Sequence, residues 1–345
     1  MKTVYSPDHI LRSAKTELTG GQLVTPYECP QRVDYVLSAI KSEQLGPIID
    51  PTHWPRQLVE NIHDKGYLTF LDTVWQRWTQ AGHQGEAIPN IWQSRSMPSQ
   101  RIPHHIQGLL GYYSLAGETS ISEGTAEAAW ASAHVSLTAA DLIHQGHSSA
   151  FALCRPPGHH ASKDQYGGYC FINNAAIAAQ KLRHDGAQKV AILDVDFHHG
   201  NGTQDIFYQR NDVFYCSIHG DPMEAFPYFL GFADETGDGL GLDHNLNLPL
   251  QRGTSYAIWH QALSHALRKI GDFKADVLII SLGVDTFEND PISFFKLKSD
   301  DFIDMGRTIA SMGLPTLFVM EGGYAVEEIG TNTVNVLKGF ENLAG

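Results

Sequence analysis

The sequence predicts an α/β fold, with a mostly parallel multi-stranded sheet and helices on both of its faces. Short apolar runs that favour β-strands alternate with helical patterns, which is typical of this class. The runs lack polar alternation, as expected for strands that are buried on both faces. Because we find no internal repeat and no linker rich in Pro, Gly or Ser, we expect a single domain over residues 1–345.

Five apolar runs are the candidate strands of this sheet. Ligands of an open parallel sheet bind beyond the carboxyl ends of its strands, so the residues that follow these runs are the candidate functional ones. In chain order the runs are Ser149–Cys154, Val190–Val195, Val213–Ile218, Val277–Leu282 and Pro315–Met320.

Capping residues and glycines set the expected bounds of three helices between the strands. Acidic residues in the first turn of a helix, as in the third of these helices, interact favourably with the helix dipole and so support its start. The helices are expected from Asn173 or Asn174 to Arg183, from Thr254 to just before Gly271, and from Ser299 to Gly313.

One segment does not read as regular structure. Residues 82–103 carry Gly, Pro, Ser and isolated aromatic residues such as Trp92, without periodicity. A loop of this length in a compact protein is usually functional or part of an interface. We therefore predict a long insertion loop at about 82–103.

The charge excludes several classes of partner. The chain has 24 Lys and Arg against 38 Asp and Glu, a net charge of −14 with histidines neutral. This opposes binding to nucleic acid or to an anionic membrane, and it would attract a cationic substrate. There is no secretory signal and no apolar stretch long enough to span a bilayer, so we expect a cytoplasmic protein.

A candidate metal site follows the run at 190–195. In an extended strand the side chains of Asp194, Asp196 and His198 point to one side, so all three are expected to face the crevice. Asp285, after the run at 277–282, can add a second carboxylate. Two carboxylates and one imidazole with an open position form a catalytic type of metal site, suited to Zn²⁺ or another divalent transition metal.

Two further strand ends carry residues for proton transfer and charge stabilisation. His159 and His160 follow the run at 149–154, and two adjacent imidazoles can supply the base and the acid of a hydrolysis. Asp194 and Asn201 are the available partners that would fix their tautomers. Tyr324, after a Gly-Gly pair, can donate a hydrogen bond to a developing oxyanion. The set predicts hydrolysis of an amide or a similar carbonyl.

The motifs that carry these residues are RPPGHHA at 155–161, GGYCFINN at 167–174, LDVDFHHGNGTQ at 193–204, SLGVDTFENDP at 281–291 and EGGY at 321–324. Over almost the whole chain, their order and spacing resemble the arginase–deacetylase superfamily, specifically its zinc-dependent histone deacetylase-like amidohydrolases. The opening ILRSAKTEL, the insertion and IHGDPMEAFPYFLG at 218–231 most closely resemble the acetylpolyamine amidohydrolases of that family.

The resemblance implies hydrolysis of acetylated polyamines or diamines to the free amine and acetate, by a water that the metal activates. It implies Asp196, His198 and Asp285 as the zinc ligands, with Fe²⁺ as the alternative metal.

By the same resemblance, His159 and His160 are the general acid–base pair and Tyr324 polarises the substrate carbonyl. Asp194 would orient His159. Asn201 stands where many histone deacetylases carry an aspartate partner of the second histidine, so we expect His160 to be less biased toward imidazolium.

For the substrate, the resemblance implies that Gly168 offers its carbonyl to the amide and that Tyr169 and Phe226 form opposite walls of a tunnel. Family members also bind a structural K⁺ beneath the zinc. Its matching positions are Asp194, Asp196, His198, Ser217 and the backbone of Ile218.

Three other functions are weighed against polyamine deacetylation. A protein-lysine deacetylase has the same site but needs an open rim, which the 82–103 insertion opposes. An arginase-like ureohydrolase with two Mn²⁺ needs more carboxylates, and none stands two residues after Asp285. A non-enzymatic acetyl-amine binder would be expected to lack Tyr324 or a metal ligand, and none is missing.

Substrate choice is expected to depend on the tunnel mouth. We expect the insertion and its continuation to Glu118 to close over the tunnel mouth. The resemblance suggests that this happens across the interface of a homodimer or higher homo-oligomer. Glu118 is the candidate partner of the distal ammonium of an acetylpolyamine, and Gln107 in the same segment can offer only a neutral dipole.

Overall fold

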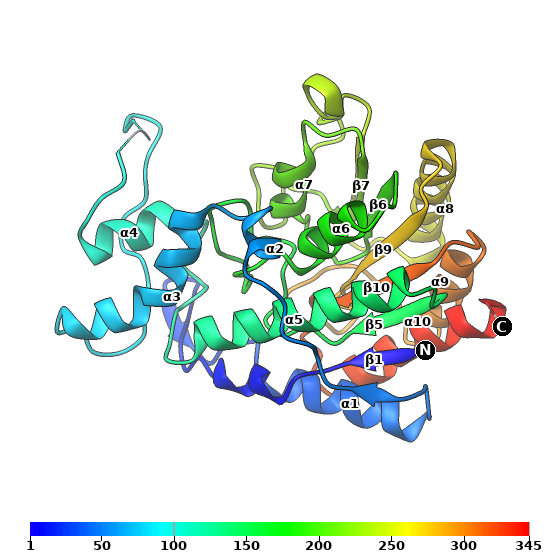
Figure 1. The fold of residues 1–345 in the computed structure, drawn as a ribbon, viewed down its shortest axis with the longest axis horizontal. Coiled ribbons are helices and arrows are strands. Elements are labelled where there is room, and N and C mark those ends of the chain that lie inside the picture. Colours follow the sequence, from blue (N-terminus) through cyan, green and yellow to red (C-terminus); the bar gives the residue numbers. More distant parts are fainter. Residues whose placement is uncertain (99–100, 345) are drawn as a thin grey trace.

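The sheet lies at the centre of the computed structural model, which describes residues 1–98 and 101–344 (Figure 1). Among these residues eight strands form one sheet in the order β4-β1-β5-β10-β9-β6-β7-β8, and every neighbouring pair is parallel. A small antiparallel hairpin, β2 and β3, stands apart from it. The strands are β1 (Lys2–Val4), β2 (Glu17–Thr19), β3 (Gln22–Val24), β4 (Ile48–Ile49), β5 (Ser149–Ala152), β6 (Val190–Asp194), β7 (Val213–Gly220), β8 (Asn245–Leu250), β9 (Val277–Leu282) and β10 (Thr316–Met320).

Helices cover both faces of the sheet, as predicted. Successive residues of β9 show why: Ile279 packs into the apolar core on one face, whereas Leu278 and Ile280 pack into the core on the other. The first face is covered by α2 (Gln57–Glu60), α3 (Lys65–Gln80), α4 (Ile106–Tyr113), α5 (Thr125–His144), α6 (Asn174–His184) and α7 (Asn201–Phe207). The second is covered by α1 (Gln31–Ser42), α8 (Tyr256–Phe273), α9 (Asp301–Ala310) and α10 (Ile329–Ala344).

The five predicted strands all form, with Val277–Leu282 as predicted and the other strands differing by one or two residues at an end. The helix bounds needed more correction. Asn173 caps α6 through its side chain, which accepts a hydrogen bond from the N–H of Ala176 at 2.9 Å. However, α8 begins after Ser255 and passes through Gly271, because its apolar face continues to Phe273 and the chain leaves the helix only at Lys274, in a left-handed conformation. Asp300 rather than Ser299 precedes α9.

The predicted insertion joins α3 to α4 and contains no helix or strand in its described parts, 82–98 and 101–103; residues 99–100 lie outside the described part. Its base is anchored to the rest of the protein. Ala87 forms an antiparallel bridge with Ile121, and the Glu86 carboxylate accepts hydrogen bonds from the Thr16 N–H at 2.9 Å and from the Ser120 hydroxyl at 3.1 Å. The loop that leads into α4 extends away from the helix layers (Figure 1).

The four cysteines are free thiols, and Cys154, Cys170 and Cys216 are buried, as expected for apolar runs. Within residues 1–98 and 101–344, no helix combines the length and apolar character that a membrane crossing requires.

Candidate active site

Loops from four strands meet at one edge of the sheet. The strands β5, β10, β9 and β6 are neighbours and run parallel, so their carboxyl ends lie side by side. The strand register pairs Asp194 with Ser281 and Leu282 with Met320. The loops that follow deliver residues far apart in sequence to one place, as the parallel-sheet rule predicts.

A buried cluster of three metal-ligating side chains lies at this edge. One ligand atom each from Asp196, His198 and Asp285 fall within 4.8 Å of one another. His198 Nδ1 lies 3.0 Å from Asp285 Oδ2 and 3.3 Å from Asp196 Oδ1. Both carboxylates are fully buried. This is the kind of Asp-His-Asp site that the motifs predicted.

The chemistry of this cluster suits a divalent cation. Burial and the nearby Asp196 charge raise the pKa of Asp285 to about 8, and a divalent cation between the two carboxylates would offset this repulsion and favour their ionised forms. Two glycines beside the cluster leave the space that its carboxylates occupy. A Cβ at Gly283 would collide with the Asp196 carboxylate, and one at Gly322 would crowd both Asp196 and Asp285.

The expected extended geometry of residues 194–198 was wrong. β6 ends at Asp194, and the chain bends from Asp196 to His198. The Asp194 carboxylate therefore does not join the three-residue cluster. It accepts a hydrogen bond from the Tyr215 hydroxyl at 3.1 Å and lies 3.0 Å from His159 Nδ1.

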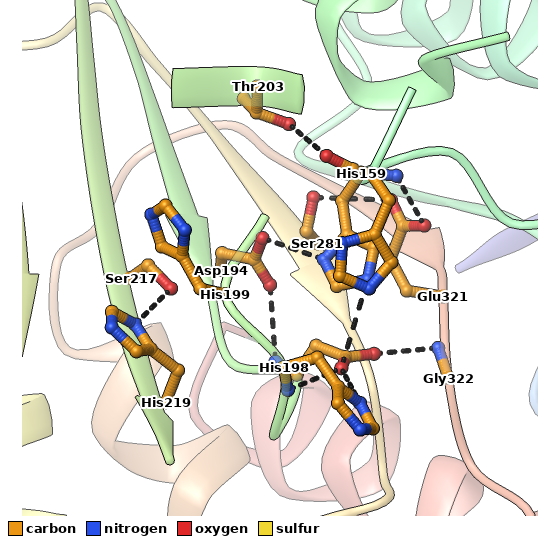
Figure 2. Close-up of polar contacts among 12 residues, drawn as sticks. His159, Asp194, His198, His199, Thr203, Ser217, His219, Ser281, Glu321 and Gly322 are labelled. Atoms are coloured by element: carbon orange, nitrogen blue, oxygen red, sulfur yellow. Dashed lines mark hydrogen bonds and ion pairs between the residues drawn. The ribbon is translucent and has the colours of Figure 1, made fainter. Parts of the chain in front are cut away.

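The two adjacent histidines have different partners and different charges. His159 lies between Asp194 and Glu321, whose carboxylate accepts the His159 backbone N–H at 3.1 Å (Figure 2). Burial opposes protonation of His159, but the charges of Asp196 and Asp194 outweigh it and raise its pKa to about 10. His160 Nδ1 lies 2.7 Å from Asn201 Oδ1. Burial, with the charge on His159, holds the pKa of His160 well below its usual value.

Tyr324 faces the same cavity from the loop after β10. The preceding Gly323 has a φ of 131°, a conformation that L side chains rarely adopt. The guanidinium of Arg32 lies 4.9 Å from the centre of the Tyr324 ring, on the side away from solvent. The backbone N–H of Tyr324 donates to Asp290 at 2.7 Å.

A cavity of about 500 Å³ leads to these groups. Tyr169, Phe226 and Gly168 line it together with His160, His198 and Tyr324, and its outer part includes Glu118. Glu118 Oε1 accepts the backbone N–H of Gly168 at 2.8 Å. Gln107 is on α4, outside the set of residues that line this cavity.

Of the positions predicted for potassium, Asp196 and His198 belong to the metal cluster, and the others lie on the neighbouring strands β6 and β7. Ser217 is the register partner of Asp194 on β7, and Ile218 follows it. The Ser217 hydroxyl lies 2.8 Å from His219 Nδ1 (Figure 2).

Several buried residues of the site were missed by the sequence interpretation. Glu17 on β2 lines the cavity, and its Oε1 accepts a hydrogen bond from the Tyr169 hydroxyl at 3.0 Å. Glu28 lies behind the site among Arg12, Arg32 and Arg155. Glu17 and Glu28 lie in the first 30 residues, where no strand end pointed to them. Glu321 could have been found, because it directly follows the run at 315–320.

The fold and the site together define the class of protein. A model of the histone deacetylase domain matches residues 26–340, and the chain belongs to this family.

Individual relatives narrow the similarity further and confirm the resemblance predicted from the motifs. The chain is 57% identical over 339 residues to the acetylpolyamine amidohydrolase of Mycoplana ramosa, which covers 98% of this chain and 99% of that protein. It is 52% identical to acetylpolyamine amidohydrolase 1 of Pseudomonas aeruginosa over the full length of both chains. The crystal structure of acetylpolyamine aminohydrolase from Burkholderia pseudomallei superposes with a TM-score of 0.95 at 39% identity, covering 100% of both chains.

Proposed function

We propose that this chain is a zinc-dependent acetylpolyamine amidohydrolase that hydrolyses acetylated polyamines or diamines to the free amine and acetate. One observation carries the proposal. The buried Asp196–His198–Asp285 cluster opens into an acidic cavity, in a chain more than half identical to an acetylpolyamine amidohydrolase.

Zinc suits this donor set best. Three protein ligands leave a position for substrate and water, as in catalytic zinc sites. Fe²⁺ also accepts two carboxylates and an imidazole, and it is the alternative. A divalent ion held by Asp196, His198 and Asp285 would polarise the acetyl carbonyl and make the attacking water more acidic.

The two adjacent histidines, His159 and His160, would serve the proton transfers of the hydrolysis. Asp194 and Asn201 each face the Nδ1 atom of one ring, which leaves both Nε2 atoms for the reaction. His160 lines the cavity and His159 lies behind it, 3.8 Å from Asp196 Oδ1. We therefore assign to His160, whose lowered pKa keeps it neutral, both the removal of a proton from the attacking water and its delivery to the leaving amine nitrogen. His159, whose raised pKa keeps it protonated, would add positive charge beside the reacting groups.

The remaining groups would hold the substrate and its developing charge. The Tyr324 hydroxyl would donate a hydrogen bond to the carbonyl oxygen as it becomes negative. The carbonyl of Gly168 would accept the amide N–H. Tyr169 and Phe226 would enclose the methylene chain between their rings.

An ammonium group on the substrate would balance the negative charge of the cavity. Arg252, the basic residue of the lining, pairs with Glu224 at 2.9 Å. Glu17 and Glu118 pair with no basic side chain in the part of the chain that the structure describes. The distal ammonium of an acetylpolyamine would supply the missing positive charge at Glu118, with Glu17 adding to the negative potential.

Two further partners belong to the proposal. A structural K⁺ would bind where β6 and β7 end, at Asp194, Ser217 and their neighbours.

A homodimer would cover the apolar side chains that the insertion exposes, such as Ile91 and Met97, which are 53% and 50% exposed. Sedimentation at several protein concentrations measures the oligomeric state, and a monomer at all of them would contradict the dimer.

The test of the proposed function is acetate release from acetylputrescine, acetylcadaverine, acetylspermidine and an acetyl-lysine peptide under identical conditions. The enzyme is prepared metal-free and reconstituted with Zn²⁺ or, without oxygen, with Fe²⁺. We expect acetylated amines to be cleaved far faster than the peptide. Equal or faster cleavage of the peptide would favour a protein-lysine deacetylase instead.

A further inference from the structure

The link between the metal cluster and Tyr324 is a glycine pair, which by itself leaves the tyrosine poorly fixed. Gly322 is held firmly, because its N–H donates to Asp196 Oδ2 at 2.8 Å and its carbonyl accepts the Val284 N–H at 3.1 Å. Gly323 follows with a φ of 131°. The Gly323 carbonyl accepts a hydrogen bond from Arg32 Nε at 2.7 Å, but its N–H side and the residues after it gain from a further anchor, because glycine has more conformational freedom than any other residue.

Asp290 is in the right place to be that anchor. Its Oδ2 accepts the backbone N–H of Tyr324 at 2.7 Å and that of Ala325 at 3.3 Å. Its Oδ1 accepts the N–H of Ile292 at 3.1 Å. Only a carboxylate offers two acceptor oxygens without a donor, so the three N–H groups explain why an acid stands here.

Asp290 lies in the same loop as the metal-ligating Asp285. It lies five residues after Asp285 in the loop that follows β9, and the Asp285 carboxylate itself accepts the Phe197 N–H at 2.7 Å. Asp290 is 7% exposed and pairs with no basic side chain within residues 1–98 and 101–344. Burial of an acid without a basic partner is unfavourable, and the hydrogen bonds from three backbone N–H groups offset part of that cost.

We propose that Asp290 is a positioning residue that fixes the Tyr324 hydroxyl relative to the metal cluster. The inference rests on the proposed role of Tyr324 as the donor to the substrate carbonyl. Asp290 does not touch the substrate, and it acts only through the backbone of the tyrosine loop.

The test is a double-mutant cycle with Tyr324, measured as kcat and KM for the best acetylated amine. Asp290→Ala removes all three acceptor contacts and should lower kcat by about 10- to 100-fold with KM changed by less than about threefold, a fraction of the loss typical of a missing oxyanion donor. Asp290→Asn, which keeps one acceptor oxygen, should lie between it and the parent. In a Tyr324→Phe background the same changes should lower kcat by less than about twofold.

The control is Glu288→Gln, which removes a carboxylate from the same loop and should change kcat in neither background. Metal content and the unfolding temperature are measured for each variant, and Asp290→Asn carries the cycle if Asp290→Ala does not fold. An equal loss of kcat in both backgrounds would refute the positioning role while leaving the proposed function intact. An unchanged kcat in Tyr324→Phe would instead refute the role of the tyrosine, and the inference with it.

Discussion

Replacing Glu28 by glutamine should lower the free energy of unfolding by an amount that depends on pH. Glu28 is buried at 2% exposure among three arginines. Its Oε1 accepts hydrogen bonds from Arg155 at 2.7 Å and from Arg32 at 3.2 Å, and Arg12 lies 3.7 Å from its Oε2. Burial alone would raise the pKa of this carboxyl, but the three guanidinium groups outweigh burial and lower it from 4.5 to about 2.

The magnitude follows from that difference. Because the pKa is lower in the folded than in the unfolded chain, the ionised Glu28 stabilises the fold above pH 4.5, and this contribution is lost as the pH falls through about 2. At about 1.4 kcal/mol per pH unit, the difference corresponds to ~3 kcal/mol at pH 7. Roughly 2 kcal/mol of it should already be lost at pH 3.

Urea unfolding of the parent and of Glu28→Gln between pH 7 and pH 3 measures this directly. The difference in free energy of unfolding between the two proteins should shrink by ~2 kcal/mol over that range. Glu43→Gln is the matched control, because Glu43 pairs with Lys338 at the surface and its removal should matter little at any pH. A parent–variant difference that stays constant from pH 7 to pH 3 would show that the arginines do not hold Glu28 ionised.

Four further changes test the site and the entrance to its cavity. Asp285→Ala should abolish tight metal binding and activity together, since two protein ligands remain where catalytic zinc has three; stoichiometric metal with full activity would exclude the cluster as the metal site. Tyr324→Phe should retain fold and metal content but lower kcat by about 10²–10³-fold, and steady-state kinetics alongside metal analysis decide this. Glu118→Gln should reduce kcat/KM for acetylated polyamines by at most about tenfold and leave a neutral N-alkylacetamide unaffected, because a partly exposed ion pair contributes only about 0–1 kcal/mol. Deletion of much of residues 85–100 should increase kcat/KM for acetyl-lysine peptides relative to acetylpolyamines; no such gain in a folded variant would show that the insertion does not restrict access to the cavity.

The central sheet and the chemical character of the site could be predicted because both depend on short-range patterns. An apolar run buried on both faces, such as Val277–Leu282, is recognisable without knowing its neighbours. Asp285 follows this run within a few positions, so it must lie at the edge of the sheet where the parallel strands end. This reasoning placed residues from four loops together without any knowledge of strand order.

Residues that reach the site from outside a strand end could not be found in this way. Glu17 belongs to a two-stranded hairpin whose strands are three residues each, too short to show a pattern. Glu28 is held ionised in the interior by three arginines, and one of them, Arg155, reaches it from more than a hundred residues away in the sequence. The bend after Asp194 was also unpredictable, because the alternation of side chains says nothing about where a strand stops.

Strand order has a consequence for how this chain is made. β10 is the last strand to be synthesised, yet it lies between β5 and β9 in the interior of the sheet. Until β10 has been synthesised, the strands before it can form only two separate half-sheets, β4-β1-β5 and β9-β6-β7-β8. Each half-sheet then has an apolar edge strand, β5 or β9, whose missing partner is the five-residue strand β10. Such edges pair readily with the wrong chain. A chain that ends before Thr316 therefore carries two unpaired half-sheets in one polypeptide, and we expect it to aggregate rather than to form a shorter enzyme.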